Sequence, residues 1–243
     1  MVDSAAVLYT YEAYLDANGV RVPFEPAIIT PAIRNAIANG KFETSEAAQI
    51  PRIVRSGDRV LEIGAGIGVI STLLAWQRRV RRVIAVEANP MLMGYMERLH
   101  ELNGVQKVRR INAVLTNSPI DTMTFYMRRD FWQGSLIPEP NPYEATVEVP
   151  TLSFDRLVHD EGISLIVCDI EGAESLLFED VDFGRVDRVF VEVHDHITGL
   201  SGVGRLFAAM ARHGFVYDPR HSVGSVILFQ KVGAVDIVRP FSG

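Results

Sequence analysis

From residue 58 onward, short runs of β-branched and other apolar residues alternate with amphipathic stretches. This alternation is typical of parallel strands joined by crossover helices. We predict seven strands, at Arg59–Ile63, Val83–Glu87, Val108–Val114, Ser164–Asp169, Arg188–Val193, Phe215–Tyr217 and Ser225–Gln230. Apolar residues recur at helical spacing between these strands, which predicts helices at Val69–Trp76, Met91–Leu102, Ala173–Glu179 and Gly202–His213.

The last two predicted strands are separated only by residues 218–224. This segment is too short for a helical crossover, so we expect the two strands to pair as an antiparallel hairpin. The predicted fold class is therefore α/β, with a Rossmann-like seven-stranded sheet that is mostly parallel, ends in a C-terminal antiparallel hairpin and is flanked by helices. This is the class I methyltransferase arrangement rather than a plain dinucleotide-binding fold.

Two segments fall outside this alternation. Residues 1–57 are interrupted by several glycines and prolines, which predicts an N-terminal extension or cap made of an irregular arm followed by helices. Residues 58–243 form the predicted cofactor-binding domain. Within it, residues 117–150 read as an insertion with two strand-like runs, Thr124–Arg128 and Ala145–Val149, around a proline-rich loop. We expect this insertion to cover the site.

The composition of the chain limits the kinds of partner that we expect. The formal net charge is −6, so the surface as a whole does not attract phosphate backbones or anionic lipids, and we expect neither nucleic acid nor membrane as a partner. The single cysteine, Cys168, lies in an apolar run and cannot form an internal disulfide. No apolar run approaches the roughly 20 residues that span a bilayer, so the sequence predicts a cytoplasmic protein.

The strongest motif is a glycine-rich turn between a strand and a helix, Gly64-Ala65-Gly66-Ile67-Gly68. Glycines let the backbone approach a ligand closely, and the helix that follows offers free N–H groups. The dinucleotide fingerprint requires glycine where this chain has Val69, which disfavours NAD. Glu87 ends the next strand, where its carboxylate can accept hydrogen bonds from both ribose hydroxyls of an adenosyl ligand.

From about Gly40 to Gln230 the chain resembles the FkbM-type family of S-adenosylmethionine-dependent methyltransferases. The resemblance is carried by Phe42-Glu43 with Glu46, by Leu61 to Gly68, by Asp169-Ile170-Glu171-Gly172-Ala173-Glu174 and by Val191-Glu192-Val193-His194. It implies O-methylation of a hydroxyl on a sugar, a polyketide or another small metabolite. It also suggests that Glu43 meets the amino group of the methionine moiety, with a surface acid on a helix as the alternative.

The predicted cofactor is therefore S-adenosylmethionine, with S-adenosylhomocysteine as product. For Asn112, contact with adenine and simple strand termination both stay open. The candidate cofactor-binding residues are Glu43, Glu62, Gly64, Ala65, Gly66, Gly68, Glu87, Ala88, Asn112, Ala113 and Asp169.

Four candidate catalytic residues, Asp169, Glu171, Glu192 and His194, follow adjacent predicted strands. Ligands bind at the carboxyl ends of strands in open α/β sheets, so these side chains should converge there. His194 is a candidate proton acceptor, because the reference pKa of histidine is near 6.5. A purely structural histidine is the alternative. Glu192 is expected to orient His194 or to hold the acceptor.

Two carboxylates and a histidine also resemble a ligand set for Mg²⁺. Because the spacing defines no closed set, no metal ligand is assigned and Mg²⁺ dependence stays open. A thiolate zinc site is excluded by the single cysteine.

The sequence favours a small-molecule acceptor, and homo-oligomerisation stays open. Phe131, Trp132 and Tyr126 in the insertion are candidates for stacking on the acceptor or the sulfonium, with core packing as the alternative. A second interpretation keeps the cofactor but transfers the methyl to nitrogen of a nucleobase or protein. An N-P-P-[FYW] motif after the fourth strand would favour an exocyclic amine, and Asp169 to Gly172 stand there instead. A third is a binding protein that retains the fold without catalysis.

Overall fold

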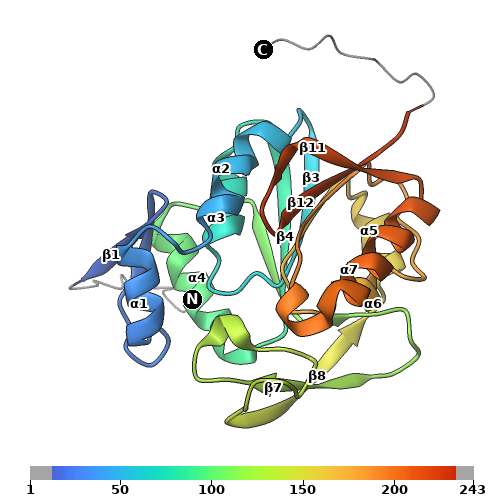
Figure 1. Ribbon diagram of the computed structural model, residues 1–243. Coiled ribbons are helices and arrows are strands. Elements are labelled where there is room, and N and C mark those ends of the chain that lie inside the picture. Colours follow the sequence, from blue (N-terminus) through green and yellow to red (C-terminus); the bar gives the residue numbers. More distant parts are fainter. Residues whose placement is uncertain (1–12, 234–243) are drawn as a thin grey trace, which may run out of the picture.

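The computed structural model describes residues 13–233 and is built around a twisted seven-stranded sheet (Figure 1). The strands lie in the order β11-β12-β10-β9-β3-β4-β5. Their bounds are β3 Asp58–Ile63, β4 Val80–Glu87, β5 Val108–Asn112, β9 Leu165–Cys168, β10 Arg188–Glu192, β11 Phe215–Val223 and β12 Val226–Lys231. Only β12 runs antiparallel to its neighbours, β10 and β11. The predicted fold class, including the C-terminal hairpin, is confirmed.

Helices cover both faces of this sheet because successive side chains of its buried strands point to opposite faces and are apolar on both. In β3, Val60 packs with α2 and α3 on one face, whereas Leu61 and Ile63 pack with α5 and α7 on the other. Figure 1 shows these two helical layers on opposite sides of the strands. The helices are α2 Thr44–Ile53, α3 Val69–Trp76, α4 Pro90–Leu102, α5 Phe154–Glu161, α6 Glu174–Leu177 and α7 Asp195–Arg212.

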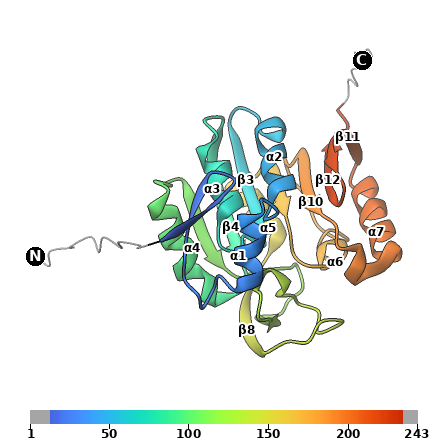
Figure 2. The same cartoon turned by 60° about the vertical axis from the view of Figure 1, so that its left-hand side comes forward.

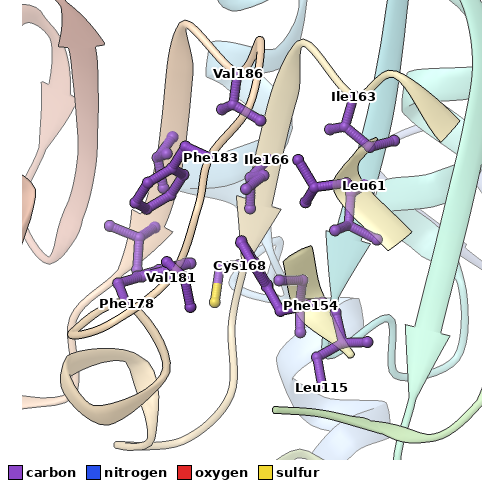
Figure 3. Close-up of a cluster of buried hydrophobic side chains, with 14 of the residues drawn as sticks. Leu61, Leu115, Phe154, Ile163, Ile166, Cys168, Phe178, Val181, Phe183 and Val186 are labelled. Carbon is purple, nitrogen blue, oxygen red and sulfur yellow. The ribbon is translucent and has the colours of Figure 1, made fainter. Parts of the chain in front are cut away.

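The larger core lies on the α5 and α7 side of the sheet (Figure 3). Figure 3 shows Leu61, Ile166 and Cys168 reaching from the strands toward Phe154 and Phe183. Phe154, Phe178 and Phe183 pack edge to face or tilted, with ring centroids 5.7–6.1 Å apart. Cys168 is a buried member of this core, directly before the acidic segment that begins at Asp169.

The N-terminal segment contains a hairpin that the sequence analysis did not predict. Strands β1 Tyr14–Ala17 and β2 Val20–Pro23 pair antiparallel across Asn18 and Gly19, both with positive φ. This is the Asn-Gly turn favoured in two-residue hairpins, so the signal was present. The hairpin and α1 Pro31–Ala38 pack against α3 and α4 through a shared apolar cluster (Figure 2).

The insertion forms a separate three-stranded sheet with the order β6-β8-β7. Its strands are β6 Val114–Leu115, β7 Thr122–Met127 and β8 Ala145–Leu152, and a 3-10 turn, η1, spans Phe131–Gln133. In both ribbon views β8 lies beyond the carboxyl ends of the central strands. The predicted strand Val108–Val114 is therefore wrong at its end, because Val114 pairs with Thr151 in this second sheet. The division at residue 57 stays a prediction.

Two helices also differ from the sequence prediction. Helix α5 was not predicted, although Ser153 is an N-cap whose hydroxyl accepts from Arg156 N–H. Helix α7 begins at Asp195 instead of Gly202, with a break at Gly199, where φ is 65°. Among residues 13–233, no helix is both long enough and apolar enough to cross a bilayer.

Candidate active site

A cavity of about 680 Å³ lies between the carboxyl ends of the central strands and the insertion. Ligand pockets commonly enclose about 300–1,000 Å³, so it has room for a cofactor together with part of an acceptor. Its wall is mainly apolar, with polar groups at a few points. The charged and aromatic residues that line it include Glu43, Glu87, Phe125, Phe131, Trp132, Asp169, Glu171, Glu179 and Asp180.

The glycine-rich turn forms one wall of this cavity. Gly64, Gly66 and Gly68 have φ values of 82°, 53° and 94°, a region that costs little only for glycine. A Cβ on Gly64 would lie 1.7 Å from the backbone oxygen of Asp169, and one on Gly68 would lie 2.7 Å from Met96 Cγ. The turn therefore needs glycine for its backbone conformation and for its close packing against the end of β9 and against α4.

Glu87 faces the same cavity from the end of β4. Gly66 N–H donates to Glu87 Oε2 at 2.8 Å, and Asn89 N–H donates to Oε1 at 2.7 Å. Burial raises the pKa of Glu87 to about 7, while the backbone hydrogen bonds pull it down. Because each carboxylate oxygen has a second lone pair, Glu87 can still accept hydrogen bonds from the hydroxyl groups of a ribose.

The eleven predicted cofactor residues separate into two groups. Seven line the cavity: Glu43, Gly64, Gly66, Glu87, Ala88, Ala113 and Asp169. The remaining four, Glu62, Ala65, Gly68 and Asn112, lie outside its lining. Glu62 is buried below the turn, and Gly68 is the N-cap residue of α3. The Asn112 amide donates to Glu87 O and Ala88 O, which supports the strand-end interpretation.

The four candidate catalytic residues also separate. Asp169 and Glu171 line the cavity, whereas Glu192 and His194 lie behind its wall. His194 Nε2 lies 3.4 Å from Asp169 Oδ1 and 3.7 Å from Glu171 Oε1. The other ring nitrogen, Nδ1, lies 2.7 Å from Glu174 Oε1. Two of the predicted residues, Asp169 and Glu171, thus meet at the imidazole of a third, His194.

The electrostatics argue against His194 as a base at neutral pH. Burial alone would lower the pKa of His194, but the hydrogen bond to Glu174 and the charges of Asp169, Glu174 and Glu171 raise it to about 10. Burial raises the pKa of Asp169 well above its usual value, and the charge of Glu192 adds to this. Burial also raises the pKa of Glu171 to about 7. At neutral pH, with no further cation bound, the imidazole keeps its proton.

Two carboxylates in this cluster were not among the predicted site residues. Glu174 is 3% exposed, accepts from Gly172 N–H at 3.1 Å and holds His194. Glu46 is buried on α2, and burial together with its hydrogen bond to Glu192 raises its pKa to about 7. Both belong to the segments quoted for the family resemblance, so their place in the sequence was visible but their burial was not.

The insertion closes the cavity with defined contacts. Ser135 Oγ donates to the backbone oxygen of Glu171 at 3.0 Å, which ties the insertion to the acidic segment. Phe131 and Trp132 line the cavity and pack on Phe42, with ring centroids 6.3 and 6.0 Å from it. Tyr126 lies outside the lining and packs on Tyr143.

A family model described as the TRM5/TYW2 methyltransferase domain matches residues 36–122, little more than a third of the chain. The matched segment contains α2, the glycine-rich turn, Glu87 and β5. Among curated proteins, a sequence search found no match.

Solved structures give weaker likenesses. Trm5b from Pyrococcus abyssi is 15% identical over 90% of this chain with a TM-score of 0.49, and this chain covers 56% of that one. The ribosomal protein L11 methylase from Lactobacillus delbrueckii subsp. bulgaricus is 14% identical with a TM-score of 0.49, covering 80% of this chain and 81% of that one. TYW2 from M. jannaschii, solved with AdoMet, is 16% identical with a TM-score of 0.41, covering 77% and 75%. At these levels the likenesses decide nothing about the reaction.

The sheet order, the cavity and the matched family model define an S-adenosylmethionine-dependent methyltransferase of class I fold. The residues fit the cofactor. Glu87 faces the cavity where the ribose is expected, and Glu43 Oε2 is buried without a hydrogen-bond partner, as suits the cationic amino group of a methionine moiety.

Two expectations from the sequence are wrong. The matching family model describes the TRM5/TYW2 domain, so the resemblance to the FkbM-type family is not supported. TRM5 and TYW2 are tRNA methyltransferases, which contradicts the exclusion of nucleic acid and the restriction to a small-molecule acceptor. The error lay in using net charge, which sums the whole surface and says nothing about where the arginines gather.

Proposed function

We propose that this enzyme methylates a ring nitrogen of a nucleobase in RNA, with tRNA as the first substrate to test. The observation that carries the proposal is the TRM5/TYW2 methyltransferase model, which matches the segment that builds the cofactor wall. No N-P-P-[FYW] motif follows β9, which disfavours an exocyclic amine as the acceptor.

The cavity offers groups that suit a flat heterocycle. Phe131 and Trp132 give it aromatic surface, and unstacked bases are commonly held by aromatic side chains. Asp169 and Glu171 give it carboxylates, which accept hydrogen bonds from the N–H groups on the edge of a base. Enzymes that modify a base usually turn it out of its stack into such a pocket.

Basic residues gather at the other end of the same sheet. Arg78, Arg79, Arg81 and Arg109 are exposed around the starts of β4 and β5, close to Lys107. We name this group the basic end. An eight-residue strand spans roughly 25 Å, so one folded RNA can reach both the basic end and the cavity. Exposed arginines are suited to phosphate contacts, which supply much of the affinity for nucleic acid.

The cofactor, when bound, supplies a methyl group already activated by the sulfonium. The protein must then align the acceptor nitrogen and take up its proton. Orientation of this kind is worth about 7–11 kcal/mol of barrier in favourable cases. Glu43 and Glu87 are suited to hold the cofactor, whereas Asp169 and Glu171 are suited to hold the acceptor and receive its proton. His194, already protonated, orients these carboxylates.

The test is transfer of labelled methyl groups from S-adenosylmethionine to purified tRNA, followed by digestion and mass spectrometry of the nucleosides. We expect one methylated nucleoside, with the methyl on a ring nitrogen. Asp169→Asn serves as the inactive control. Label in no RNA fraction, together with label in a low-molecular-mass extract of the same cells, would contradict the proposal.

The basic end gives a second, independent readout. The pair Arg78→Ser and Arg81→Ser should weaken RNA binding about three- to thirtyfold and flatten its dependence on salt by up to about two counterions, because two phosphate contacts are removed. Binding of S-adenosylhomocysteine should not change. Arg156→Ser, an exposed arginine on α5, is the matched control. Equal RNA affinity in both variants would remove the basic end from the proposal.

A further inference from the structure

The imidazole of His194 is held in one orientation by a buried carboxylate. Its Nδ1 lies 2.7 Å from Glu174 Oε1, and both side chains are at most 6% exposed. Glu174 is itself fixed by the N–H of Gly172. A carboxylate on one ring nitrogen is the usual second sphere of a metal-binding histidine, because it sets the tautomer and directs the other nitrogen at the ion.

The free nitrogen of this imidazole points at two carboxylates. Nε2 lies 3.4 Å from Asp169 Oδ1 and 3.7 Å from Glu171 Oε1, and the three atoms all lie within 4.8 Å of one another. Two ligands of one ion at 2.0–2.2 Å are separated by roughly 2.8–4.4 Å. Shifts of a few tenths of an ångström would therefore bring all three atoms onto one ion.

An unsatisfied oxygen points to the same place. Asp169 Oδ1 is buried and has no hydrogen-bond partner among the described residues, although polar atoms in protein interiors are nearly always paired. Other acids lie within electrostatic range of this oxygen. After burial, Glu192 and Glu46 contribute to the raised pKa of Asp169, and Glu46 and Asp169 contribute to the raised pKa of Glu43. The cationic groups that face the cluster are His194 and, from the insertion, Arg128.

We propose that Asp169, Glu171 and His194 together bind one divalent cation at the acceptor end of the cavity, with Glu174 as the residue that orients His194. Because a metal-bound imidazole nitrogen must be deprotonated, binding of the ion releases the Nε2 proton of His194 to solvent. Two carboxylate oxygens and one imidazole nitrogen suit ions of the Mg²⁺ and Mn²⁺ class and leave positions open for water or for an acceptor atom. Since Asp169 and Glu171 line the cavity, the ion is accessible from the side on which the acceptor enters. The site does not depend on the nature of that acceptor.

The test is binding of Mn²⁺ to the whole protein without acceptor, measured by calorimetry and by electron paramagnetic resonance. We expect one ion per chain and spin-echo modulation from one directly bound nitrogen. Glu171→Gln and Asp169→Asn should each weaken binding at least about tenfold, by analogy with the loss seen when partners of metal ligands are removed. Melting curves establish that each variant folds.

Glu192→Gln is the matched control, because it removes a neighbouring charge without removing a proposed ligand. Its affinity for Mn²⁺ should fall by less than about threefold. The proposal is overturned if the wild-type protein binds no Mn²⁺ at millimolar concentration, if no nitrogen modulation appears, or if Glu192→Gln weakens binding as much as Glu171→Gln. Metal binding and RNA methylation are measured separately, so failure of one leaves the other standing.

Discussion

Two regions of the cavity wall differ in what lies opposite their carboxylates, which is backbone N–H in one region and other acidic side chains in the second. The cofactor region, residues 58–87, presents Glu87, whose two oxygens each accept a backbone N–H from within or just beyond this segment. The acceptor region consists of Glu46, Asp169, Glu171, Glu174, Glu192 and His194, which come from separate segments of the chain. There, carboxylates face other carboxylates, and Asp169 Oδ1 has no hydrogen-bond partner within the described chain.

The difference teaches which part of the site is complete without a ligand. In the cofactor region the backbone serves as the counter-group, so the geometry exists before any ligand binds. In the acceptor region, the imidazole of His194 is the nearby cation for several carboxyl groups. Burial raises the pKa of Glu46, Asp169 and Glu171. Because these carboxyl groups repel one another when ionised, this region favours the binding of a cation or of a group that donates a proton.

The most damaging change to the cofactor region is Gly64→Ala. The new Cβ would lie 1.7 Å from the backbone oxygen of Asp169, and because both atoms are fixed to the backbone, the clash cannot be relieved by a change of rotamer. We expect loss of more than about 4 kcal/mol of unfolding free energy, measured by urea denaturation, with no binding of S-adenosylhomocysteine. Gly57→Ala is the matched control, because its φ of 86° is similar but nothing lies within 4 Å of the added carbon. Similar losses in both variants would mean that φ, not the close approach, governs this turn.

The cofactor region was also the part most visible in the sequence. Its strand, glycine-rich turn, helix and acid follow one another within 30 residues, so their spacing alone placed Gly64, Gly66 and Glu87 on the cavity wall. The strands of the central sheet and the final hairpin were predictable for the same reason, since hydrophobic periodicity and connection length are local properties.

The acceptor region could be predicted only in part. Asp169, Glu171 and His194 were recognised because strand ends meet at one edge of a sheet. Glu46 and Glu174 were not, because burial of an acid on a helix depends on what packs over it. The contact of His194 with Glu174 at 2.7 Å, which raises the pKa of the imidazole, is one that no spacing reveals. The family and partner were wrong because motif likeness and net charge are both indirect.

In the acceptor region, the largest functional effect is expected from Glu171→Gln. The amide keeps the shape of the side chain but cannot take up a proton or bind a cation as strongly. We expect turnover to fall about 100- to 10,000-fold, the usual range for loss of acid-base assistance, while the affinity for S-adenosylhomocysteine stays within about twofold. Glu148→Gln, on exposed β8, is the control. A rise in cofactor Kd with unchanged turnover would instead assign Glu171 to the cofactor region.

A smaller effect is expected from Glu87→Ala, which removes the acid while leaving the glycine-rich turn in sequence. Binding of S-adenosylhomocysteine should weaken by about 1.5–3 kcal/mol, the range for hydrogen bonds to a charged group. Part of this loss comes from Gly66 N–H and Asn89 N–H, which lose their acceptor. Calorimetry on Glu87→Ala and Glu87→Gln separates the two contributions, because the glutamine can still accept from one N–H. Unchanged affinity in both would exclude Glu87 from ribose binding.

The last effect concerns Glu62, a buried acid below the glycine-rich turn of the cofactor region. Glu62 is 2% exposed with Oε2 unpaired, and burial raises its pKa to about 8 against weaker opposing hydrogen bonds with Ser71. Because the folded state holds this proton more tightly than the unfolded state does, stability should fall as pH rises from about 4.5 to about 8. Glu62→Gln removes the titration, so the variant should gain on the order of 2–3 kcal/mol relative to wild type between pH 6 and pH 8.5. Urea denaturation at both pH values measures this gain. The same pH dependence of stability in the two proteins would show that the pKa of Glu62 is not raised by folding.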